Sequence, residues 1–148
     1  MANENVDNYF EQPVGGGTDN KLVLGGSVES PGGASVKTAR VTVQMDDISN
    51  PQSVWISIGE ACTFRKLTSI INGAITAADA EITTEIGGVA VTGGALTIAN
   101  SGSAAGVVDT ATPTAANVLT AAQGLEIITD GGSTGTVAAV FVVEFELS

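Results

Sequence analysis

The chain contains no histidine and only one cysteine, Cys62. Without histidine, the usual catalytic triads, histidine acid–base chemistry and the commonest transition-metal ligand are absent. One cysteine allows no intrachain disulfide and, without histidine, none of the usual zinc ligand sets. A cysteine nucleophile would also lack its usual base, so Cys62, close to Phe64 in a strand-like segment, is interpreted as a small buried hydrophobic residue. We therefore predict a non-enzymatic protein with no catalytic residue, no cofactor and no metal.

Positive charge is also scarce, because 5 basic residues stand against 16 acidic ones and the formal net charge is -11. All the basic residues lie within the first 66 positions: Lys21, Lys37, Arg40, Arg65 and Lys66. Binding to nucleic acid or to an anionic membrane surface depends on Lys and Arg, so we predict neither as a partner. The N-terminus lacks a basic stretch followed by an apolar run, and no apolar run reaches the ~18–20 residues of a membrane span. The sequence therefore predicts a protein made in a cytoplasm.

Glycine is abundant, with 19 positions in the 148-residue chain, and it is clustered in residues 1–35. Short apolar groups alternate there with Gly15-Gly16-Gly17, Gly25-Gly26 and Gly32-Gly33. Glycine raises the entropy cost of ordering a segment, so this stretch is not expected to form a core of its own. We predict an extended arm over 1–35 that docks on another protein surface, with a disordered tail as the alternative. The apolar residues predicted to make its contacts are Val6, Tyr9, Phe10, Val14, Leu22, Val23 and Leu24.

From residue 36 to 148 the apolar residues recur with a period of two, which is typical of strands. This alternation predicts strands over 41–45, 54–58, 63–71, 82–86, 89–91, 96–98, 125–127 and 137–147. Gly87-Gly88 and Gly93-Gly94 predict tight hairpins, while 100–117 is interpreted as a long loop, with an alternative short helix over 115–122. Many short strands, glycine turns and long loops predict one all-β domain, a jelly-roll-like antiparallel β-sandwich.

The last strand is predicted to have two unlike faces. One face is apolar throughout, from Val137 through Phe141 to Leu147. The other carries Val140 and Val142 and then two glutamates, so half of it is apolar. A face of this kind is expected to be covered at one end and exposed to water at the other. We predict that Val140 and Val142 contact a neighbouring subunit.

Two groups of polar residues are candidate sites. Asp46, Asp47, Ser49 and Asn50 could supply oxygen ligands for calcium, but their spacing lacks the alternation of an EF-hand loop, and an ordinary capped turn explains them better. Any two of Asp79, Glu81, Glu85 and Glu126 could approach each other as the carboxylates of a glycoside hydrolase. A solvated strand face explains Glu81 and Glu85 better, since aromatic residues make up only 4% of the chain.

Several turn-and-strand segments in the second half of the chain form a characteristic series. They are 80–83 (AEIT), 89–98 (VAVTGGALTI), 101–106 (SGSAAG), 112–118 (TPTAANV) and 128–134 (ITDGGST), followed by the hydrophobic C-terminal strand. With this series, the chain from Ala78 onward resembles the small head decoration, or cement, proteins of tailed bacteriophages. The resemblance covers about half of the chain. It implies a compact β-sandwich trimer on the outer face of the shell that clamps neighbouring major capsid subunits.

The leading hypothesis is therefore a capsid cement protein on the outer surface of a virion, with the major capsid protein and itself, as a homotrimer, for partners. In this hypothesis the arm contacts the capsid, and Val140 and Val142 contact other subunits. An alternative is the carbohydrate- or receptor-binding head of a fibre or spike, for which Trp55 and Tyr9 are the available aromatic residues. A small hydrolase that uses the carboxylates above is the third hypothesis, and the missing catalytic groups argue against it.

Overall fold

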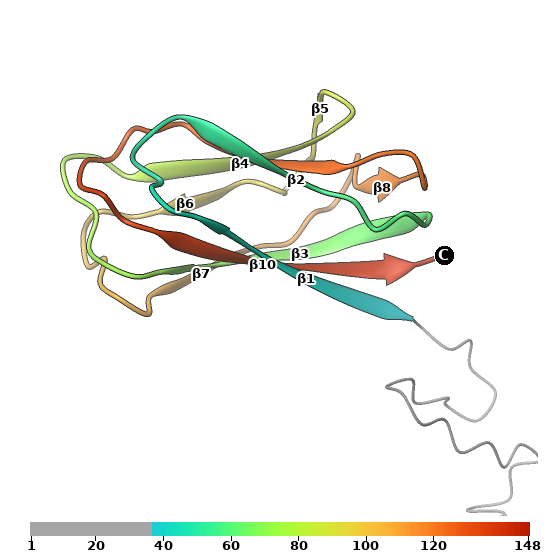
Figure 1. The fold of residues 1–148 in the computed structure, drawn as a ribbon, viewed down its shortest axis with the longest axis horizontal. Coiled ribbons are helices and arrows are strands. Elements are labelled where there is room, and N and C mark those ends of the chain that lie inside the picture. The colour runs from blue at the N-terminus through green and yellow to red at the C-terminus, as the bar shows by residue number, and fades with distance from the viewer. Residues whose placement is uncertain (1–36) are drawn as a thin grey trace, which may run out of the picture. The chain divides into compact units, whose positions relative to one another are not determined.

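The structure, a computed structural model, describes residues 37–148. This part of the chain is all-β, with ten strands in two antiparallel sheets and no helix, hence none that could cross a membrane (Figure 1). The predicted arm and its seven contact residues, from Val6 to Leu24, lie outside the described residues. The first strand begins at Thr38, close to the predicted start of the β-domain at residue 36.

The two sheets contain five strands each. Sheet A runs in the order β1 (Thr38–Met45), β10 (Ala139–Leu147), β3 (Cys62–Ile71) and β7 (Val108–Ala111), and β8 (Val118–Leu119) also pairs with β3. Sheet B runs in the order β2 (Gln52–Ile56), β9 (Leu125–Thr129), β4 (Ala80–Ile86) and β5 (Val89–Ala90), and β6 (Leu96–Ile98) also pairs with β4. In Figure 1 the strands β2 and β4 belong to one layer, and β1, β3 and β10 to the other.

The pairings are nested along the chain. The first strand pairs with the last, β2 pairs with β9, β3 pairs with β7 and β8, and β4 pairs with β5 and β6. A chain that folds back on itself in this way and then divides between two sheets has the strand order of a jelly roll. The predicted antiparallel β-sandwich is therefore confirmed, with a jelly-roll-like order of strands.

The core lies between the sheets because each strand alternates between buried and outward residues. On β10, Ala139, Phe141, Val143 and Phe145 are fully buried, as the apolar face predicted for this strand requires. The rings of Phe64 and Phe145 pack with centroids 6.0 Å apart at a tilted angle of 44°. Sheet B contributes fully buried leucine and isoleucine side chains to the same cluster, among them Ile82, Leu125 and Ile127. This core fills the space between the sheets without the side chains of the two outer faces.

Two expectations for residues 100–122 were wrong. The predicted loop contains the strand β7, and the short helix considered over 115–122 is replaced by β8. The backbone N–H of Phe64 donates to the carbonyl of Asn117, whose side-chain amide donates in turn to the carbonyl of Phe64. Ala116 has a φ of 53°, which interrupts a right-handed helix. Pairing with β3 therefore overrides the local helix preference of the alanines.

The two glycine pairs behave differently. Gly87 and Gly88, with φ of 60° and 79°, form the predicted tight hairpin between β4 and β5. The hairpin predicted at Gly93-Gly94 was wrong, because β5 and β6 do not pair with each other but follow one another along β4. The intervening residues loop out, and the hydroxyl of Thr84 donates to the carbonyl of Gly94 at 3.1 Å.

Candidate binding surfaces

The outer face of sheet A carries a row of apolar side chains. Val140 on β10 pairs with Ile70 on β3, and Ile70 pairs with Val108 on β7, so the three stand side by side. Ile70 is 36% exposed and Val108 53% exposed, while Val140 in the central strand is partly buried. We call these three residues the apolar row. All three are β-branched residues on strands, so their side chains lose little rotamer entropy when a partner covers them.

Val142 lies in the next row, between Thr42 of β1 and Thr68 of β3. The structure therefore places Val140 and Val142, the predicted subunit contacts, in the middle of an outer sheet face. Their role as contacts stays a prediction. Sequence analysis missed Ile70 and Val108. Strict alternation over 63–71 puts Ile70 on the same side as Phe64, but the bulge in the pairing of β3 with β10 leaves Phe64 buried and Ile70 exposed.

The same face of sheet A also carries ion pairs. Arg40 on β1 binds Glu144 on β10 at 3.2 Å, and Arg65 on β3 binds Glu146 at 2.6 Å. Lys66 lies opposite Glu144 in the strand register. These pairs are exposed to water, so each contributes little to stability. They balance the charge of this face toward the C-terminal end of β10, beyond Val142 from the apolar row.

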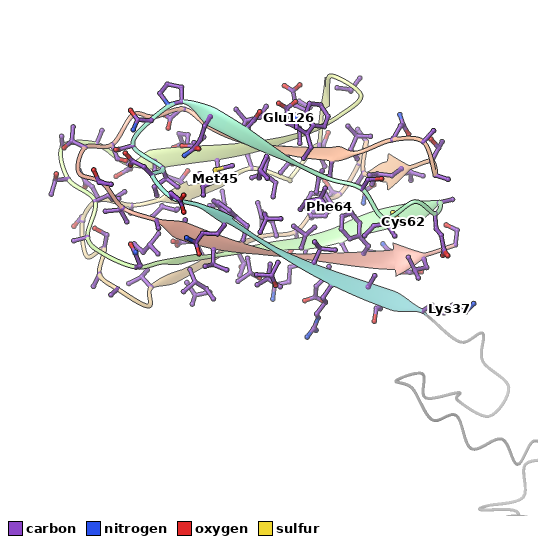
Figure 2. All side chains as sticks on the ribbon, viewed as in Figure 1. Lys37, Met45, Cys62, Phe64 and Glu126 are labelled. Atoms are coloured by element: carbon purple, nitrogen blue, oxygen red, sulfur yellow. The ribbon has the colours of Figure 1, made fainter. Side chains whose placement is uncertain are left out.

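The outer face of sheet B has a different chemistry. Trp55 on β2 is 58% exposed and pairs with Glu126 on β9, and Glu126 pairs with Glu85 on β4. We call these three residues the tryptophan row. The strands of sheet B contain no Lys or Arg. Figure 2 shows Glu126 on the outside of the upper sheet, whereas Met45 and Phe64 lie between the layers.

The chain was compared with known proteins to test the resemblance to phage decoration proteins. No family model and no curated protein matches it. The resemblance therefore stays a prediction, and the functional assignment depends on the chemistry of the two outer faces.

The loop considered for calcium is a turn whose carboxylate is already occupied by hydrogen bonds. The backbone N–H and the hydroxyl of Ser49 both donate to Oδ1 of Asp47, at 2.9 and 2.5 Å, and the amide of Asn50 donates to Oδ2. The bonds from Ser49 are the main cause that lowers the pKa of Asp47 below its ordinary value of 3.8. Asp46 accepts a bond from the side chain of Gln44. The residues thus form the capped turn, and residues 37–148 hold no cluster of three potential acidic, cysteine or histidine metal ligands.

Of the four carboxylates proposed for hydrolysis, Glu85 and Glu126 lie directly across from each other in the strand register. Both oxygens of Glu81 accept from the hydroxyl of Thr97, and Asp79 accepts from the backbone N–H of Asn100. The carboxylates of Glu81 and Asp79 therefore accept hydrogen bonds from a neighbouring strand and a turn. The Glu85–Glu126 pair lies on an outer sheet face, beside Trp55. An open face of this kind is suited to binding another molecule.

Cys62 is fully buried at the start of β3, as predicted for a small hydrophobic residue. Burial raises the pKa of its thiol, and the nearby carboxylate of Glu60 raises it further. Both effects favour the protonated thiol, which is a poor nucleophile. Cys62 therefore serves the core.

Proposed function

We propose that this chain is a non-enzymatic capsid decoration protein, which binds the outer face of a phage head and stabilises contacts between major capsid subunits. The observation that carries the proposal is the apolar row on the outer face of sheet A. The domain already has a complete core between its sheets, so Val140, Ile70 and Val108 are not needed to fill it. A sandwich with a jelly-roll-like strand order is also an architecture of viral capsid proteins, a likeness that supports the proposal by analogy alone.

The energetic mechanism is the burial of small apolar areas in many copies. Each Å² of apolar surface removed from water contributes about 25 cal/mol. A row of three aliphatic side chains therefore gives only a modest contact per copy. In the proposal this contact holds subunits together, and the resulting trimer presents three arms to a regular lattice. Binding of one arm then raises the effective concentration of the next, so weak individual contacts are enough for decoration.

The subunit contact is assigned to Val140 and Val142, extended by Ile70 and Val108. In this proposal the homotrimer buries the apolar row, and the balanced charges of Arg40 and Glu144 lie beyond Val142 on the same face. The capsid contacts are assigned to the apolar residues of the arm, from Val6 to Leu24. Neither nucleic acid nor membrane is proposed as a partner, since only four basic residues occur in 37–148, on or beside the strands of sheet A.

The proposal predicts that the double variant Ile70→Thr, Val108→Thr loses its self-association. Threonine keeps the β-branched shape but removes the apolar surface, so the solution mass is expected to fall from trimer to monomer. Binding to capsids that lack this protein is expected to weaken by about tenfold or more, since a factor of ten corresponds to about 1.4 kcal/mol. The matched control is Ile128→Thr, which makes the same kind of change on the outer face of sheet B and is expected to leave the mass unchanged.

The arm is tested in the same capsid-addition experiment with a shortened chain that starts at Ser35. Saturable binding by a trimer that weakens on removal of residues 1–34 would establish the assignment of the arm. The buried core lies within 45–145, so the shortened chain keeps it. A full-length monomer that does not bind capsids would refute the decoration hypothesis.

A second candidate function is the carbohydrate- or receptor-binding head of a fibre or spike. The observation that favours it is the exposure of Trp55, since aromatic rings on open faces are binding platforms and jelly rolls also occur in lectins. Binding to a glycan array that disappears in Trp55→Ala would support this candidate. The same variant should leave decoration of capsids unchanged if the apolar row carries that function.

A further inference from the structure

The tryptophan row combines an exposed aromatic ring with two carboxylates in strand register. Trp55 has the largest side chain among the exposed hydrophobic residues of 37–148, and it lies directly across from Glu126. Glu126 lies directly across from Glu85, and both glutamates are partly exposed. Residues that face each other across antiparallel strands have Cβ atoms about 4.5–5.5 Å apart. The ring and both carboxylates are therefore within reach of a single side chain of a partner.

The two carboxylates have no counter-charge within residues 37–148. Like charges directly across from each other destabilise a sheet. The basic residues of this part of the chain lie on β1 and β3 of the other sheet or just before β1, and the ion pairs that the structure contains are formed there with Glu144 and Glu146. Glu85 and Glu126 take part in no ion pair of the described residues. A cation from another molecule would convert this repulsion into attraction.

The indole of Trp55 lies beside a loop that is held in place by hydrogen bonds. A Cβ atom on Gly124 would lie 3.4 Å from Cε3 of Trp55, so the backbone of this loop lies within van der Waals reach of the indole. The loop is held by Gln123, whose side-chain oxygen accepts from the backbone N–H and the hydroxyl of Thr120, at 2.9 and 3.1 Å. The β4–β5 hairpin lies next to this loop, since a Cβ atom on Gly87 would lie 3.3 Å from the side-chain nitrogen of Gln123, and its Val89 is 59% exposed. The row is thus an ordered platform before any partner arrives.

We propose that the tryptophan row binds an arginine or lysine side chain from an extended basic segment of a partner protein. The cation lies over the indole of Trp55, which is the best aromatic partner for a positive charge. The N–H groups of the partner donate to the carboxylates of Glu126 and Glu85, and the fork of an arginine fits such acceptors well. A neutral sugar could stack on the same ring but would leave the two carboxylates without a counter-charge. The formal net charge of -11 adds long-range attraction for a basic partner.

The site is independent of the decoration proposal, since it uses the opposite face of the sandwich. It can also be tested on the full chain alone, because Trp55 is the single tryptophan and its fluorescence reports on the site directly. The probe is a short peptide of alternating arginine and glycine. We expect a saturable change in Trp55 fluorescence at about 0.05 M salt that weakens strongly at about 0.5 M, where charges are screened within a few Å. A neutral oligosaccharide of similar length serves as the competing ligand.

Two charge variants and one matched control decide the assignment. Glu126→Gln and Glu85→Gln keep the shape of the side chain and leave the fluorophore in place. Each is expected to lower the affinity for the peptide by about tenfold, the scale of one charge-assisted contact. Glu81→Gln removes one charge from the other end of the same face of β4, and its effect is expected to stay within about threefold. Equal losses in Glu81→Gln and Glu126→Gln would overturn the site in favour of general attraction. The absence of a fluorescence response to the peptide, or a saturable response to the oligosaccharide instead, would refute the proposal that the row binds a cationic side chain.

Discussion

Replacing Phe141 with alanine is expected to lower the free energy of unfolding by about 3–5 kcal/mol. Phe141 is fully buried in β10, which lies between β1 and β3 in sheet A and pairs there with Val43 and Ser69. Alanine removes the ring from the middle of the core, and strands held on both sides have little freedom to close the cavity. Since the free energy of unfolding of a domain of this size is about 5–15 kcal/mol, the variant would lose a large part of its stability.

The change is measured by urea denaturation followed by circular dichroism. The control is Val142→Ala on the same strand, which removes a side chain from the outer face and is expected to cost about 1 kcal/mol or less. The two variants share their strand and differ in the face they alter. Equal losses of stability would contradict the assignment of Phe141 to the core face of β10.

Replacing Gly131 with alanine is expected to cost about 2–4 kcal/mol. Gly131 follows β9 with a φ of +68°, which favours glycine, and a Cβ atom there would lie 2.5 Å from the backbone nitrogen of Pro51. This nitrogen is part of the backbone of the β1–β2 loop, so it cannot rotate away as the end of a flexible side chain would. The substitution therefore adds a steric clash to the strain of a positive φ.

Gly135→Ala separates these two contributions. Gly135 also has a positive φ, +93°, but no atom lies within 4 Å of the Cβ position, so only backbone strain is added. Its expected cost is about 1 kcal/mol. The midpoint of thermal unfolding should fall further for Gly131→Ala than for Gly135→Ala. If both midpoints fall equally, the contact with Pro51 is not what requires glycine at 131.

The strands were predictable where side chains alternate clearly. The alternation at Val41, Val43 and Met45 predicted β1, and the faces predicted for β10 are those observed. Prediction failed at Val108–Ala111, where four residues supply too short a pattern, and at 115–122, where alanines favour a helix locally. It also failed at Gly93-Gly94, because a glycine pair allows a turn without determining which strands the turn connects.

The binding surfaces were predictable only in part for the same reason. Alternation placed Trp55 on the face opposite to Val54 and Ile56, and Val140 on the face opposite to Phe141, as observed. It did not show that Trp55 lies next to Glu126, nor that Val140 lies next to Ile70 and Val108. Those neighbours come from strands far apart in the sequence.

The sequence by itself determined the all-β class, the inward and outward sides of most strands and the turn at Gly87-Gly88, because these depend on neighbours within a few residues. Only the tertiary structure decided the nested strand order, the apolar row of sheet A and the tryptophan row of sheet B. Each row depends on the register between distant strands, and register is set by how the whole core packs. A shift of one residue in β9 would turn Glu126 inward and separate the chemistry that the fold brings together.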